Sequence, residues 1–154
     1  MRRIIATVLT GVAATAGVIG VTAASSASAT TAETFTLIGH VKSEHIVDQG
    51  PKGDSAGDYG TISGSLFRDG KHVGRYLGVC TQFDAKGHSI CQFVFALPGG
   101  QLQLQSGYGK GVNGNRVVRD AIVGGTGVYA GATGEGVGRE TGRTTIKEVV
   151  HLQN

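Results

Sequence analysis

Charged side chains at strand positions are the residues of this 154-residue chain best placed to do chemistry. Arg75 interrupts an alternating apolar segment, and Arg119 and Asp120 directly precede another. Glu135 and Arg139 lie four positions apart, so they would share one face of a strand. A charge that faces a protein interior costs on the order of several kcal/mol unless it is paired. These residues therefore either point outward or belong to a functional site.

Two glycine motifs resemble catalytic or cofactor fingerprints, but their surroundings exclude those functions. Gly125–Ala130 matches GxGxxA, yet Gly131–Gly138 follows where a dinucleotide-binding helix must begin. Residues 53–57 match GxSxG, but a hydrolase nucleophile requires a strand before it and a helix after it. Pro51 and Gly60 flank this motif instead. It is therefore expected to be a polar loop.

The chain gives no sign of a metal or nucleic-acid site. The histidines lack metal-ligand spacing, which predicts that no metal is bound. There is no run of Lys and Arg and no basic face with interleaved aromatics, so nucleic acid is not an expected partner. The histidines are His40, His45, His72, His88 and His151.

The two cysteines are predicted to form a disulfide across a β-hairpin. Strands are expected over His72–Phe83 and His88–Leu97, with a turn that contains Gly87 between them. Centring the hairpin on this turn places Cys80 directly opposite Cys91. Opposed residues have the short Cβ separation that a disulfide requires.

The rest of the chain also reads as strands separated by glycine-rich turns, with no helical periodicity. A long polar loop is expected over Asp48–Asp58, and Gly124–Gly125 is expected to form a turn. A short-turn meander of eight strands predicts an all-β, antiparallel, up-and-down barrel, with a two-sheet sandwich as the alternative. Six further strands are expected over residues 35–41, 61–67, 101–108, 116–123, 133–140 and 144–152.

The N-terminal segment resembles a secretory signal peptide. Met1–Arg3 is cationic, Ile4–Ala24 is apolar, and Ala27–Ala29 fits a small-residue cleavage site. We therefore expect a signal peptide over residues 1–29 and one domain over residues 30–154, secreted and free of the membrane. A membrane anchor is the alternative reading of the same apolar stretch.

Several segments, in order, resemble the allene oxide cyclase and dirigent group of barrels. Val73–Gly78 (VGRYLG) is similar to the VGRxxG strand of plant dirigent proteins, and Phe93–Phe95 (FVF) to their next strand. Ala121–Gly134 resembles the GGTG-containing segment of both families, and Gly57–Gly60 resembles the dirigent loop that carries an Asp. The chain is thus similar to a bacterial secreted member of this group.

The resemblance implies an eight-stranded barrel with a central apolar cavity. Relatives steer the cyclisation or coupling of a reactive small molecule by holding it in one geometry, without a cofactor. Asp58 corresponds to the dirigent loop Asp and Arg75 to the Arg of the VGR strand, whereas Tyr59 replaces a second Asp. The resemblance also implies a homo-oligomer.

Two functional hypotheses follow from these observations. In the first, the barrel binds a small hydrophobic or phenolic molecule and guides its cyclisation or stereoselective coupling. Asp58 and Glu135 would then be acid/base groups and Arg75 a charge stabiliser, with the cavity walls provided by Tyr76, Tyr108 and Tyr129. In the second, the protein is a non-catalytic extracellular carrier or interaction module. An open cavity of a few hundred Å³ would favour the first hypothesis, and a packed interior the second.

Overall fold

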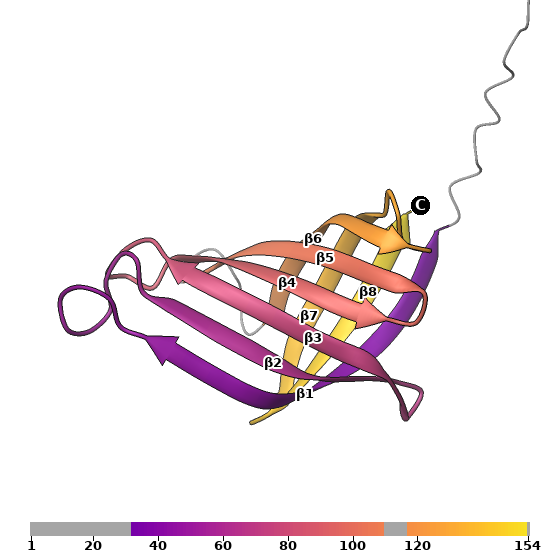
Figure 1. Ribbon diagram of the computed structural model, residues 1–154, viewed down its shortest axis with the longest axis horizontal. Helices are drawn as coiled ribbons and strands as arrows, with labels where there is room; N and C mark the ends of the chain where they lie inside the picture. The colour runs from indigo at the N-terminus through magenta and orange to yellow at the C-terminus, as the bar shows by residue number, and fades with distance from the viewer. Residues whose placement is uncertain (1–31, 110–116, 154) are drawn as a thin grey trace, which may run out of the picture.

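The computed structural model describes residues 32–109 and 117–153, which form a closed antiparallel β-barrel (Figure 1). Strand order follows chain order, and β1 closes the barrel by pairing with both β2 and β8. The predicted barrel is therefore confirmed, and the sandwich is excluded. The proposed signal peptide lies outside the described residues. The strands are β1 (Glu33–Val47), β2 (Tyr59–Arg68), β3 (Lys71–Gln82), β4 (Ser89–Leu97), β5 (Gly100–Tyr108), β6 (Val117–Gly127), β7 (Thr133–Gly142) and β8 (Thr145–Gln153).

Alternation along each strand separates an apolar interior from a polar outer face. The interior is packed at the end of the barrel where β1 begins and β8 ends, and Leu37, Leu102 and Leu152 are at most 1% exposed there. Burying a side chain of this size contributes about 1.5–3 kcal/mol. This packed end gives the barrel its stability and leaves the opposite end free to be hollow. No helix in the described part of the chain is long and apolar enough to cross a membrane.

The glycines after Val123 do not form the expected turn. Strand β6 continues to Gly127, and the turn lies beyond it, over residues 128–132. A Cβ on Gly125 would lie 2.7 Å from the Gln101 carbonyl oxygen, and one on Gly127 would collide with the Gly99 carbonyl. Gly125 and Gly127 are therefore needed because neighbouring backbone approaches them closely. Gly127 also has a φ of +62°, which suits the turn that begins there.

The β3–β4 hairpin has the predicted register, with Cys80 paired to Cys91. Their sulfurs form a disulfide, as expected from the sequence. Both side chains lie on the inner face of the barrel near its open end.

We expect the double variant Cys80→Ala/Cys91→Ala to remain folded but to lose about 2–3 kcal/mol of unfolding free energy. The disulfide restricts the unfolded chain by closing a short loop, and this restriction would be lost. Urea denaturation measures the change, with the reduced native sequence as a control for the loss of two thiols. An unchanged urea midpoint would contradict a stabilising role.

Candidate functional site

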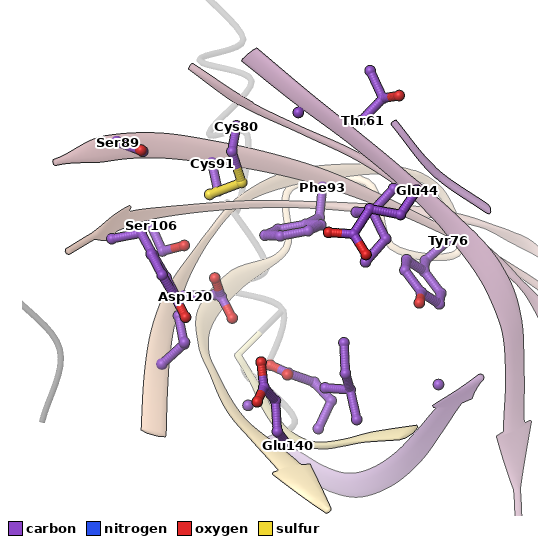
Figure 2. Close-up of a pocket in the computed structure, with 18 of the residues that line it drawn as sticks. Glu44, Thr61, Tyr76, Cys80, Ser89, Cys91, Phe93, Ser106, Asp120 and Glu140 are labelled. Atoms are coloured by element: carbon purple, nitrogen blue, oxygen red, sulfur yellow. A yellow bond between two sulfur atoms is a disulfide. The ribbon is translucent and has the colours of Figure 1, made fainter. Parts of the chain in front are cut away.

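The open end of the barrel contains a cavity of about 630 Å³, within the range typical of small-molecule sites. Its walls are mainly apolar and come from all eight strands (Figure 2). Ile62, Tyr76 and Phe93 line one side, together with the Cys80–Cys91 disulfide. The cavity can therefore hold a small apolar or aromatic molecule.

Two buried carboxyl groups, Asp120 of β6 and Glu148 of β8, form part of the cavity wall. Each residue is only 5% exposed. Strand β7 runs between them, with Gly136 paired to Asp120 and Gly138 paired to Glu148. A Cβ on Gly138 would lie 2.6 Å from Glu148 Oε2 and 3.8 Å from Asp120 Oδ2. The missing side chains of β7 therefore provide the space in which the two carboxyl groups meet.

The environment of this pair favours its protonated form. Burial is the main reason that the pKa of Glu148 rises to about 9, and the charge of Asp120 and a hydrogen bond with it add to the increase. Burial also raises the pKa of Asp120, while the nearby Ser106 hydroxyl and Glu148 carboxyl group oppose that rise. At neutral pH the pair therefore retains a proton inside an apolar cavity.

Several polar atoms around the cavity have no hydrogen-bond partner among the described residues. They are Tyr76 Oη, Ser106 Oγ, Asp120 Oδ1 and Glu148 Oε1. Leaving buried polar groups unpaired costs stability, and such groups in native proteins often belong to functional sites. The atoms are thus available to a bound molecule.

Asp58, predicted to be an acid/base group, lines the cavity but holds the neighbouring loop in place. Its carboxylate accepts hydrogen bonds from the backbone amides of Gln49 at 2.6 Å and Ser55 at 2.7 Å, and from the Ser55 hydroxyl at 3.1 Å. The amide bonds are the main reason that the pKa of Asp58 is lowered. A carboxylate satisfied in this way orders the loop over residues 48–58 and is poorly suited to take up protons.

Arg75 and Glu135 lie outside the cavity. Arg75 is exposed on the outer face of β3, because its neighbour Tyr76 occupies the inward position. Glu135 is exposed on β7, where its carboxylate pairs with Arg119 at 3.1 Å. The geometry therefore gives no support to their predicted catalytic roles.

The three predicted tyrosines occupy different parts of the barrel. Tyr76 is buried in the cavity wall, and Tyr108 lines the mouth with 46% exposure. Tyr129 packs against the closed-end core and does not line the cavity. Two of the three therefore lie where a bound molecule could contact them.

Sequence reasoning missed Glu148 and Ser106, and it noted Asp120 only as a strand charge. The alternation of apolar residues along β8 could have identified Glu148 as inward-facing, because it has the same parity as Ile146, Val150 and Leu152. Within the described ranges, no group of three or more His, Cys, Asp or Glu residues could hold a metal ion.

The chain is similar to several solved structures. A pyocyanin demethylase is 27% identical over 78% of this chain and 99% of its own, with a TM-score of 0.69. A pterocarpan synthase dirigent protein is 18% identical over 82% of this chain and 88% of its own, with a TM-score of 0.61. A Diels-Alderase from Streptomyces koyangensis is 16% identical over 83% of this chain and 70% of its own, with a TM-score of 0.63.

These similarities show that the fold is a dirigent-like or cyclase-like β-barrel. No protein-family model and no curated protein matches the sequence.

Proposed function

We propose that this protein binds a small apolar or aromatic molecule in the barrel and guides its cyclisation or a related isomerisation by proton transfer. The observation that carries the proposal is the buried Asp120–Glu148 pair on the wall of an otherwise apolar cavity. The walls hold the reactant in one geometry, and the carboxyl pair exchanges a proton with it.

The proposed proton transfer is balanced within the site. The Glu148 carboxyl donates its proton to an electron-rich atom of the bound molecule and becomes a carboxylate beside Asp120. After rearrangement, the carboxylate removes a proton from another position of the same molecule, which restores the starting state. The net reaction is an isomerisation that consumes no oxidant or reductant and needs no cofactor.

Three of the similar structures support ring closure inside such a barrel, whereas the proton transfer is proposed from the carboxyl pair alone. These structures are a [4 + 2] cyclase described as a nonspecific heme-binding protein and two Diels-Alderases. Pyocyanin and pterocarpans, the compounds named in the other similar structures, contain aromatic rings, which fits a cavity lined by Tyr76 and Phe93. The GGTG segment further supports membership of the allene oxide cyclase barrel group for residues 30–154.

We also propose that the protein is exported. The apolar leader over residues 1–29 suits a cleaved signal, and the Cys80–Cys91 disulfide suits an oxidising compartment.

Native mass spectrometry of the disulfide-intact protein, followed by turnover assays on phenolic and polyunsaturated compounds, tests the proposed activity. We expect a bound small molecule and a compound converted to a product of the same mass. Glu148→Gln should reduce kcat by about 10²–10⁴, the usual contribution of a general acid or base. Glu135→Gln is the control, since Glu135 lies on the outer face.

Binding without conversion of any compound would favour the carrier hypothesis. Equal turnover by Glu148→Gln would reject the role of the carboxyl pair, even if the barrel proved to be an enzyme.

A further inference from the structure

The charges around the cavity are strongly unbalanced. Glu44 and Glu140 are exposed lining residues, whereas Asp120 and Glu148 are buried in the wall. Figure 2 shows Glu44, Asp120 and Glu140 around the cavity. The only basic residue among the described lining residues is Arg139, which is exposed. The charged lining residues are Glu44, Asp58, Asp120, Arg139, Glu140 and Glu148.

Asp58 does not add to the charge available to a ligand, because its carboxylate is satisfied by the loop amides. The other four carboxyl groups have no cationic partner among the ion pairs of the described residues, since those pairs involve only Glu33, Asp84 and Glu135. A cleft lined by one sign of charge attracts molecules of the opposite sign.

A second feature, independent of the acidic residues, also points to a bound molecule. The hydroxyl groups of Ser106 and Tyr76 line the same cavity and lack partners within the described part of the chain. These residues are only 6% and 3% exposed. The aromatic faces of Tyr76 and Phe93 also suit an organic cation, because a ring face attracts positive charge.

We infer that the molecule taken by this cavity is an aromatic base or organic cation, whose positive nitrogen pairs with the carboxyl groups of Asp120 and Glu148. This inference rests on the proposed function and deepens it by stating the class of substrate. An aromatic base takes the proton held by the pair and becomes the cation that the resulting carboxylate binds. The same acidic wall excludes carboxylates, because their charge would oppose that of the pair in a medium of low dielectric.

Three fluorescent tricyclic probes of similar shape test the charge preference. N-methylacridinium is a permanent cation, 9-methylanthracene is neutral, and anthracene-9-carboxylate is an anion. We expect the native protein to bind the cation at least tenfold more tightly than the neutral probe, and the anion least. Affinity for the cation should rise between pH 6 and pH 9, since each proton lost from the pair makes the wall more negative.

The double variant Asp120→Asn/Glu148→Gln should bind the cation at least tenfold more weakly and the neutral probe as well as the native protein does. Binding of the neutral probe also shows that the variant is folded. The matched control is Glu33→Gln/Glu135→Gln, which removes two carboxylates from surface ion pairs and should leave all three affinities unchanged.

Equal or tighter binding of the neutral or anionic probe would overturn the inference and leave the proposed function standing. A cation preference that survives in the Asp120→Asn/Glu148→Gln variant would also overturn it. Failure of the folded native protein to bind any probe would reject both the inference and the use of the cavity as an aromatic site.

Discussion

Glu148→Gln is expected to stabilise the barrel at neutral and alkaline pH. The gain in unfolding free energy over the native protein should be about 3 kcal/mol larger at pH 7 than at pH 4. The carboxyl group has a pKa near 4.5 in the unfolded chain and about 9 in the folded protein. Between these values the folded state binds the proton that the unfolded state releases. The native protein therefore loses stability as the pH rises from about 4.5 to about 9, and glutamine removes this loss.

Urea denaturation at pH 4, 5, 6, 7 and 8 measures the effect. The difference in unfolding free energy between Glu148→Gln and the native protein should grow steadily with pH. Because Asp120 also has a raised pKa, the variant should retain a weaker dependence of the same sign. Glu135→Gln is the control, and its curve should run parallel to that of the native protein. Parallel curves for Glu148→Gln as well would show that Glu148 is not held protonated.

The expected loss of stability supports a functional role for the pair. A leucine or methionine at position 148 would fill the inward site without the cost of a buried ionisable group. Retaining two carboxyl groups there makes sense if the protein uses their proton. The same reasoning applies to the unpartnered hydroxyls of Ser106 and Tyr76.

The barrel could be predicted from the sequence because its signals are local. Alternating apolar residues and glycine turns placed eight strands, and one turn fixed the register of Cys80 and Cys91. The extent of β6 could not be predicted, since its glycines are required by the approach of Gln101 in β5 and of Gly99 in the β4–β5 turn. A single strand carries no information about that contact.

The candidate site was harder to predict, because inward and outward charges look alike until the parity of each strand is known. Arg75 and Glu135 have the outward parity of their strands, opposite to Tyr76 and Gly136. Glu148 has the inward parity of β8 and shares it with buried Val150. Strict alternation would have ranked Glu148 above Arg75. The proximity of Glu148 to Asp120 across β7 also depends on the register of β6, β7 and β8, which could not be predicted from the sequence.

Gly136→Ala is the substitution expected to damage the site most directly. A Cβ at this position would collide with Glu148 Oε1 and lie 3.1 Å from Leu104 Cδ2. Moving a buried carboxyl group out of a packed wall is costly, so we expect a loss of about 1–3 kcal/mol in unfolding free energy. We also expect the pH dependence contributed by Glu148 to weaken, since the displaced carboxyl group leaves its buried position.

Gly142→Ala on the same strand is the matched control, because its Cβ would make only ordinary contact with Thr145 at 3.6 Å. It should change stability little. The double variant Gly136→Ala/Glu148→Ala shows whether the loss of stability comes from the collision with the Glu148 carboxyl group or from a general intolerance of β7 to side chains. If the carboxyl group is the obstacle, the double variant should be more stable than the sum of the two single effects predicts. Additive effects would mean that β7 requires glycine for backbone reasons, and that the space for the carboxyl pair is incidental.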